Sequence, residues 1–182
     1  MSNPFTDVII IRGAPGSGKT ETSKFLAAHF RKGARVEVDT LRSMVISADW
    51  TNQAEHMSIL SLSTGVVSGF LRLGCKPVIL VDTFSGDKLP KFLAELRGLD
   101  STLHVRSFAL VVATEVLRAR VEGRPEGHFK NLSVCQEING ELIGNLQPAE
   151  CIIDNTELTP AATAETIISS LARAQWRVRP QP

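Results

Sequence analysis

The sequence predicts an α/β fold in which a parallel sheet is covered by helices on both faces. Two observations carry this prediction. Short apolar runs of strand length alternate along the 182-residue chain with longer segments whose apolar residues recur at helical spacing. The first run also leads straight into a glycine-rich loop that opens a helical segment. Because strands joined through helices run parallel, the alternation favours a three-layer αβα sandwich.

Five apolar runs are expected to form the strands of this sheet. The first, residues 7–12, contains consecutive isoleucines, which is typical of a strand buried on both faces. Pro77 is tolerable in a later run because it lies near the start of that strand. The five expected strands are residues 7–12, 34–38, 76–82, 102–112 and 150–154.

Helical spacing accounts for most of the chain between these strands. Gly33 ends the first helix, and Thr159-Pro160 places an N-cap residue before a proline at the start of the last one. No element is assigned to residues 83–101. A stretch interrupted by Gly and Pro, at about 122–131, is expected to be a short mobile lid. The expected helices are 19–31, a segment from Thr40, about 52–74, a segment from Thr114, a segment through Leu132 and Ile138, and a segment from Pro160.

Length and composition suit a single domain spanning residues 1–182. Hydrophobic residues make up 43% of the chain and charged residues 21%, close to the averages of globular proteins. No apolar run approaches the roughly 18 residues of a membrane span, and no leader sequence is visible, so we expect a cytoplasmic protein with no membrane contact. The formal net charge of +1 argues against a long nucleic-acid footprint and leaves room for a small basic site.

The glycine-rich loop has the G-x-x-x-x-G-K-T spacing of a phosphate-binding loop. Its glycines let backbone N–H groups point at phosphate oxygens, and the helix that follows adds a favourable dipole. Lys19 would reach the terminal phosphates, and the Thr20 hydroxyl would hold Mg²⁺. An incidental glycine-rich turn is the alternative. The predicted nucleotide-binding residues are Gly13, Ala14, Pro15, Gly16, Ser17, Gly18, Lys19 and Thr20.

Asp39 and Arg42 follow the second expected strand, at the edge where open parallel sheets place their ligands. A carboxylate there could accept the proton of an attacking hydroxyl. Arg42, three residues on, would share a helix face with Asp39 and could clamp an anionic or polar substrate group. The alternative is that Asp39 caps the next helix and that Arg42 is its surface partner.

Asp82 ends the third expected strand, in the manner of a Walker B segment. It could bind Mg²⁺ through a water or hydrogen-bond Thr20, and the alternative is a plain turn residue. Thr83 stands where many ATP-hydrolysing motors carry a glutamate that orients water. Hydrolysis is therefore a less favoured main activity.

A basic cluster precedes the expected lid. Arg120 and Arg124 are four residues apart and share a helix face, so they could stabilise phosphate oxygens as an in-chain arginine finger. Arg118 is a weaker candidate, and a solvated basic helix end is the alternative. His128 and Lys130 could touch a substrate or be solvated.

The order of these motifs resembles that of the small P-loop kinases, which include polynucleotide 5′-hydroxyl kinases, zeta-toxin-like kinases and antibiotic phosphotransferases. The resemblance covers nearly the whole chain. It implies the P-loop NTPase fold, a five-stranded parallel sheet in the order 2-3-1-4-5. It also implies that Asp39 is the general base, that Arg42 binds the acceptor, and that Lys19, Arg120 and Arg124 stabilise the transferring phosphoryl group.

We therefore expect an ATP- and Mg²⁺-dependent kinase that moves the γ-phosphoryl group to a hydroxyl of a small-molecule or nucleotide-type acceptor. ATP is favoured over GTP because no guanine-reading motif is present. A 5′-hydroxyl nucleic-acid end is a further candidate acceptor, and Trp50 would either stack on a base or fill the core. The alternatives are an NTP-hydrolysing switch or accessory ATPase with a protein partner, and a nucleotide-binding module without turnover. The oligomeric state is open.

Overall fold

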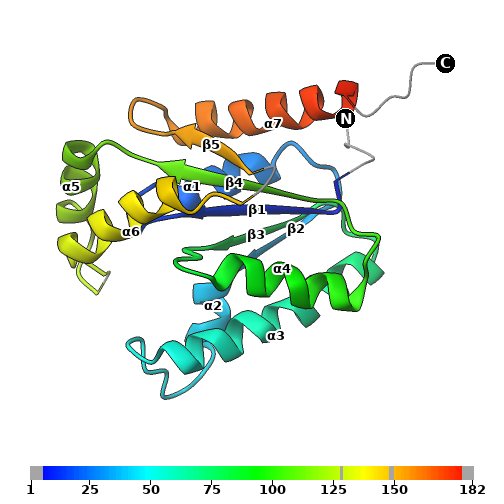
Figure 1. Ribbon diagram of the computed structural model, residues 1–182, viewed down its shortest axis with the longest axis horizontal. Coiled ribbons are helices and arrows are strands. Elements are labelled where there is room, and N and C mark those ends of the chain that lie inside the picture. The colour runs from blue at the N-terminus through cyan, green and yellow to red at the C-terminus, as the bar shows by residue number, and fades with distance from the viewer. Residues whose placement is uncertain (1–5, 128, 148–149, 178–182) are drawn as a thin grey trace.

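The computed structural model describes residues 6–127, 129–147 and 150–177, with side chains described up to Arg173. Its strands form one five-stranded parallel sheet in the order β2-β3-β1-β4-β5 (Figure 1). This order confirms the predicted fold. The strands are β1 (Val8–Gly13), β2 (Ala34–Glu37), β3 (Val78–Asp82), β4 (Val105–Val111) and β5 (Cys151–Asp154).

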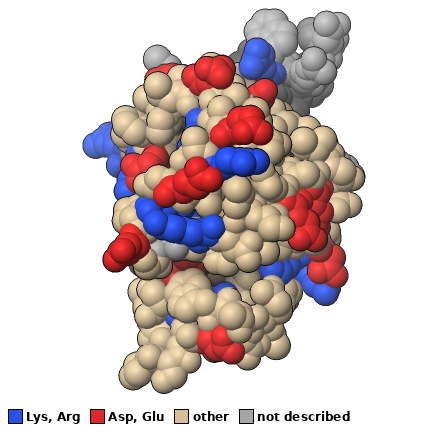
Figure 2. All heavy atoms as spheres, turned by 90° about the vertical axis from the view of Figure 1, so that its left-hand side faces the viewer, with Lys and Arg blue, Asp and Glu red and all other residues tan. Residues whose placement is uncertain are grey.

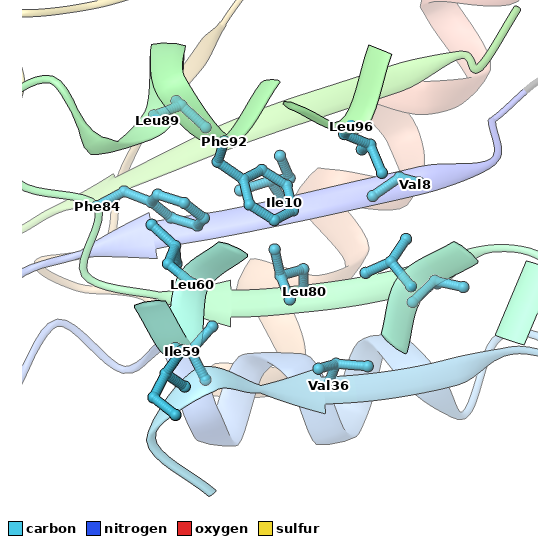
Figure 3. Packing of buried hydrophobic residues seen from close by; sticks show 13 residues of the cluster. Val8, Ile10, Val36, Ile59, Leu60, Leu80, Phe84, Leu89, Phe92 and Leu96 are labelled. Carbon is cyan, nitrogen blue, oxygen red and sulfur yellow. The ribbon is translucent and has the colours of Figure 1, made fainter. Parts of the chain in front are cut away.

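Helices cover both faces of the sheet, because successive residues of the central strand β1 point to opposite sides. Val8 and Ile10 pack against α3 and α4, whereas Ile9 and Ile11 pack against α1 and α7. Figure 3 shows the first of these two clusters, in which Phe84 and Phe92 meet edge to face. The helices are α1 (Lys19–Ala27), α2 (Val38–Ser43), α3 (Gln53–Arg72), α4 (Lys88–Leu99), α5 (Thr114–Glu122), α6 (Leu132–Gly144) and α7 (Pro160–Arg177). None of the described helices is both long and apolar enough to cross a membrane.

Helix α4 is absent from the elements that the sequence predicts. Its buried residues Leu89, Phe92 and Leu96 have helical spacing, but Pro90 interrupts the pattern near its start. Proline is tolerated there because the first N–H groups of a helix have no partner within the helix. The stretch therefore folds as a regular helix over β1 and β3.

Two helix boundaries also differ from the prediction. The first helix ends at Ala27, and residues 28–33 form a turn before β2. Helix α2 begins at Val38, directly after β2, instead of at Thr40. Asp39 therefore lies in the first turn of α2, where the N-terminal end of the helix favours a carboxylate.

The carboxyl ends of the strands all lie at one edge of the sheet, on the left in Figure 1. The β1–α1 loop and the β3–α4 connection start at this edge, and α2 follows β2 there. Parallel topology thus brings the predicted functional residues, which are far apart in the sequence, to one place.

Candidate active site

The loop between β1 and α1 is held in its shape by glycines and by a contact from the residue that follows the edge strand β5. A Cβ atom on Gly13 would lie 2.3 Å from Ser17 Oγ and 2.8 Å from the backbone oxygen of Leu110. Gly18 has a φ of +94°, which L side chains rarely adopt. The Asn155 amide, after β5, donates to the backbone oxygen of Ser17 over 2.6 Å. The loop is therefore preformed.

Lys19 folds back over this loop. Its Nζ donates to the backbone oxygens of Gly13 at 2.7 Å and Ala14 at 3.0 Å. Burial lowers the pKa of Lys19 from 10.5 to about 8, and the carboxylates of Asp39 and Asp82 partly oppose this shift. An ammonium that has lost hydration and faces carbonyl oxygens can exchange them for the oxygens of an anion.

Glu37 is a cleft residue that the sequence reasoning does not identify. Its Oε2 accepts a hydrogen bond from the Thr20 hydroxyl at 3.3 Å, and its other oxygen pairs with Arg35. The position is the last residue of β2, two residues before Asp39. The sequence does carry a signal for Glu37. It lies two residues before Asp39, and two residues so spaced around the end of a strand can both reach the same edge of the sheet.

Asp82 is buried and fixed through both carboxylate oxygens. Oδ1 lies 3.3 Å from His56 Nε2, and Oδ2 accepts from the backbone N–H of Phe84 at 3.0 Å. Burial alone would raise the pKa of Asp82, but the hydrogen bonds with His56 and Phe84 and the charge of Lys19 hold it below its usual value. Asp82 is therefore an ionised carboxylate rather than a plain turn residue.

His56, on α3, connects Asp82 with a lysine nearer the surface. Lys88 Nζ lies 3.5 Å from His56 Nδ1 and also donates to Gln53 Oε1 at 2.9 Å. Because an ammonium group cannot accept a hydrogen bond, we assign Nδ1 as the acceptor and Nε2 as the donor to Asp82. The sequence gives no spacing signal for His56, since its partner is 26 residues away.

Asp39 stands beside Asp82 but has different surroundings. Within the described part of the chain no group donates a hydrogen bond to its carboxylate, and solvent reaches it from the mouth of the cleft. Desolvation by the surrounding protein, together with the neighbouring Asp82, raises the pKa of Asp39 above its ordinary value. A carboxylate that is free to accept a proton and has a raised pKa is suited to general-base chemistry.

Arg120 lies in the last turn of α5, whereas Arg124 follows two residues after the helix ends at Glu122, so the two do not share a helix face as their spacing predicts. Arg120 Nη2 donates to the backbone oxygens of Asn155 at 3.0 Å and Thr156 at 3.2 Å. Arg124 Nη1 donates to the backbone oxygen of Phe129 at 2.7 Å, across the connection expected to be a lid. Arg118 is exposed and pairs with Glu115.

Movement of that connection remains a prediction. His128 lies outside the described residues, and Lys130 is exposed.

One cleft of about 580 Å³ brings most of the predicted residues together. It opens at the carboxyl edge of the sheet, the side that faces the viewer in Figure 2. The figure shows charged side chains of both signs over the upper part of this face and a mostly uncharged lower lobe. The charged residues and the residues of the β1–α1 loop that line the cleft are Pro15, Gly16, Gly18, Lys19, Thr20, Glu21, Glu37, Asp39, Asp82, Arg120 and Arg124.

Arg42 is not among the residues that line this cleft. It is buried, and its Nη2 donates to the backbone oxygens of Asp49 at 2.5 Å and Asn52 at 3.1 Å. Its Nε lies 3.4 Å from Glu55 Oε1, and its guanidinium carbon lies 4.9 Å from the centre of the Trp50 ring. Trp50 is 52% exposed, so it does not fill the core. Contact between Arg42 and an acceptor stays a prediction.

Arg12 is a third residue, after Glu37 and His56, that the sequence analysis leaves without a role. Although it lies in the central strand, its buried guanidinium donates to Glu150 Oε1 at 2.7 Å and Oε2 at 2.6 Å. It also donates to the backbone oxygens of Phe84 at 3.2 Å and Asn145 at 2.9 Å. Arg12 thus fixes the turn whose N–H group holds Asp82.

Comparison with known proteins adds a fold assignment. No family model and no curated protein matches the chain. A sugar kinase from Janibacter sp. HTCC2649 is 20% identical, with 93% of this chain and 97% of that one covered and a TM-score of 0.68. A gluconokinase from Sinorhizobium meliloti 1021 is 18% identical, with 98% and 100% covered and a TM-score of 0.64. A chain of the Pnkp1/Rnl/Hen1 RNA repair complex is 22% identical, with 77% and 45% covered and a TM-score of 0.65. This chain therefore has the αβα fold of the small P-loop kinases.

Proposed function

We propose that this protein is an ATP-dependent kinase that phosphorylates a hydroxyl group. The observation that carries the proposal is the position of Asp39, a carboxylate to which no described residue donates a hydrogen bond and which lines the same cleft as Lys19 and the glycine-rich loop. A phosphate-binding loop alone would suit any NTPase. A proton acceptor in the same cleft is what transfer to an alcohol requires.

On the donor side, the loop N–H groups and Lys19 would bind the β- and γ-phosphates of ATP. Lys19 would then exchange its two carbonyl partners for phosphate oxygens. Arg120 and Arg124 line the cleft on the side of α5 and would stabilise the charge of the transferring phosphoryl group. Closure of the α5–α6 connection would exclude water from the reaction.

The residues near Thr20 fit a magnesium ion bound together with ATP. Thr20 and Asp82 supply hydroxyl and carboxylate oxygens, which Mg²⁺ prefers, and Glu37 adds a third oxygen donor that already contacts Thr20. Among the described residues no group of three or more His, Cys, Asp or Glu side chains could hold a metal. An Mg²⁺ ion bound with ATP would take most of its other ligands from phosphates and water. Bound there, Mg²⁺ would neutralise charge on the phosphates.

On the acceptor side, Asp39 would take the proton of the attacking hydroxyl. The acceptor oxygen forms a bond to the γ-phosphorus as the bond between that phosphorus and the β,γ-bridging oxygen breaks, and ADP leaves. Arg42 would contribute by holding the chain that follows α2, whether or not it also touches the acceptor.

The similar folds support a kinase and not a particular acceptor. Sugar kinase and gluconokinase structures favour a small-molecule hydroxyl, and the RNA repair complex keeps a 5′-hydroxyl end as a candidate. An NTP-hydrolysing switch remains the rival function. Thr83 after Asp82 gives no carboxylate at the position where hydrolytic motors carry a glutamate.

Incubation with γ-labelled ATP and Mg²⁺ tests the proposal. Candidate acceptors are sugars, nucleosides, aminoglycosides, chloramphenicol-like alcohols and 5′-hydroxyl oligonucleotides, with Lys19→Ala as the inactive control. The kinase proposal expects label in an acceptor. Release of labelled phosphate alone, stimulated by a protein partner, would instead support the switch.

A further inference from the structure

Asn155 is a buried polar residue in the wall of the cleft, where it begins the connection between β5 and α7, residues 155–159. It is only 2% exposed. A buried amide is costly unless it is hydrogen-bonded, so the partners of Asn155 show what this position requires. Figure 1 shows the connection at the carboxyl edge of the sheet, on the same side as α5.

Both ends of the Asn155 side chain have partners. Its Nδ2 donates to the backbone oxygen of Ser17, in the glycine-rich loop, at 2.6 Å. Its Oδ1 accepts from the Thr163 hydroxyl, in α7, at 2.5 Å. Because a backbone oxygen can only accept, the amide nitrogen must face Ser17 and the amide oxygen must face Thr163. The two partners therefore fix one orientation of the amide.

This orientation acts on the peptide group that joins Ser17 to Gly18. In a planar trans peptide the C=O and N–H bonds point in opposite directions. Since the C=O of Ser17 points at Asn155, the N–H of Gly18 points away from Asn155. Gly18 lines the cleft, and a Cβ atom on it would lie 2.8 Å from Asn155 Nδ2. The contact thus needs glycine at position 18 and sets the direction of one N–H donor of the loop.

The backbone of Asn155 holds another part of the cleft. Its oxygen accepts from Arg120 Nη2 at 3.0 Å. Its N–H donates to the oxygen of Val111, the last residue of β4, at 2.8 Å. Asn155 is thereby joined to the glycine-rich loop, to the end of β4, to α5 and to α7. One residue fixes the loop and Arg120 relative to each other, although they are about 100 residues apart in the sequence.

We propose that Asn155 is a positioning residue for the phosphates of the bound nucleotide. Its side chain would hold the N–H of Gly18 toward a phosphate oxygen, and its backbone oxygen would hold Arg120 beside the same phosphates. Thr163, which does not line the cleft, would act through Asn155. The inference rests on nucleotide binding within the proposed function, and it adds the β5–α7 connection to that site.

Calorimetric binding of ADP and of inorganic tripolyphosphate tests this role. For Asn155→Ala we expect the Kd of each ligand to rise about tenfold, as when one hydrogen bond that orders a binding loop is lost. The two ligands should weaken equally, because the Gly18 N–H would contact phosphate and not the base. In phosphotransfer, the KM for ATP should rise by the same factor and the KM for the acceptor should stay unchanged.

Asn139→Ala is the matched control. Asn139, on α6, is also buried, and its amide donates to the backbone oxygen of Val112, next to the end of β4, at 2.7 Å. It does not line the cleft. Both alanine variants should lose stability in urea, because both remove a buried amide. Only Asn155→Ala should lose affinity, whereas the Kd of Asn139→Ala for ADP should stay within about twofold of the wild type.

Thr163→Val is a milder variant that keeps the test decisive if Asn155→Ala does not fold. It removes the hydroxyl that orients the amide and leaves the amide in place. The Kd of both ligands should rise about threefold. Added to Asn155→Ala, the same substitution should change the Kd no further, because the partner of the hydroxyl is already gone.

The outcomes separate this inference from the kinase proposal. Weaker binding of ADP with unchanged binding of tripolyphosphate would place Asn155 against the base and overturn the inference. Equal losses of affinity in Asn155→Ala and Asn139→Ala would also overturn it, because the effect would then be a general loosening of the fold. Label in an acceptor, with wild-type Kd values in Asn155→Ala and Thr163→Val, would remove the role of Asn155 and leave the kinase standing. Affinity that depends on Asn155, with no acceptor phosphorylated, would support the inference and count against the kinase.

Discussion

His56 Nε2 lies 3.3 Å from Asp82 Oδ1. This contact joins strand β3 of the sheet to helix α3, which covers it. Both side chains are buried. A buried carboxylate is costly unless it is hydrogen-bonded, and His56 supplies one of the two hydrogen bonds that the described residues give Asp82. Asp82 can thereby stay ionised at the bottom of the cleft, where the proposal places it near Mg²⁺.

Removal of the His56 ring should therefore weaken the fold and the proposed reaction together. For His56→Ala we expect the free energy of unfolding in urea to fall by about 1–3 kcal/mol, the usual effect of leaving a buried acceptor without its donor. His56→Gln, whose amide can donate to Asp82, should recover part of this loss. Equal stability of the alanine variant and the wild type would contradict the role assigned to His56.

The buried pair of Arg12 and Glu150 should matter more for stability. Their side chains are 1% and 0% exposed, so Arg12→Met would leave an unpaired buried carboxylate. Breaking a buried pair on one side typically costs about 3–5 kcal/mol. The double variant Arg12→Met/Glu150→Leu should be more stable than Arg12→Met alone, as measured by urea unfolding. A double variant that is less stable than the single one would show that the bond from the Gln147 N–H to Glu150 Oε2 outweighs the cost of the unpaired carboxylate.

Glu37 should affect the requirement for Mg²⁺. Because its carboxylate contacts the Thr20 hydroxyl, Glu37→Gln removes negative charge from the proposed metal site. The Mg²⁺ concentration that gives half-maximal phosphotransfer should rise several-fold, and nucleotide binding without metal should stay the same or improve. Arg35→Met is the matched control, because Arg35 pairs with the Glu37 oxygen that does not contact Thr20. An unchanged Mg²⁺ titration in Glu37→Gln would remove Glu37 from the metal site.

The lowered pKa of Lys19 predicts how nucleotide binding depends on pH. Lys19 is protonated below about 8 and attracts phosphates, and in the free protein it loses this charge as the pH rises through that value. The affinity for ADP, measured calorimetrically from pH 7 to 10, should therefore fall above about 8. The fall should not exceed about tenfold per pH unit, because one proton is involved. Lys19→Arg stays charged throughout, and its affinity should not fall in this range.

Much of the fold could be predicted because its signals are local. The isoleucine run of β1 and the spacing of Ala164, Ile167 and Leu171 in α7 give the same answer in the sequence and in the structure. The sheet order came from the resemblance to a family and was confirmed. Helix α4 was missed because Pro90 hides the spacing of its apolar residues, which only packing against the sheet makes decisive.

The sequence predicted those residues of the candidate site that lie at or just after the ends of strands. It did not predict residues whose contacts are far away in the sequence. Lys19 and Asp39 follow the strands β1 and β2 and Asp82 ends β3, so their convergence follows from parallel topology. His56 and Glu150 gave no signal, because their partners are 26 and 138 residues away. The backbone oxygens that Arg42 binds give no signal in the sequence either, and its contact with an acceptor stays a prediction.

The most direct test of the account is the effect of Asp39→Asn on phosphotransfer to the best acceptor found. The substitution keeps the shape of the side chain and removes the proton acceptor. We expect ATP affinity to change by no more than about threefold and kcat to fall by about 10² or more, as for loss of a general base. Wild-type kcat in Asp39→Asn would contradict the kinase mechanism proposed for this cleft.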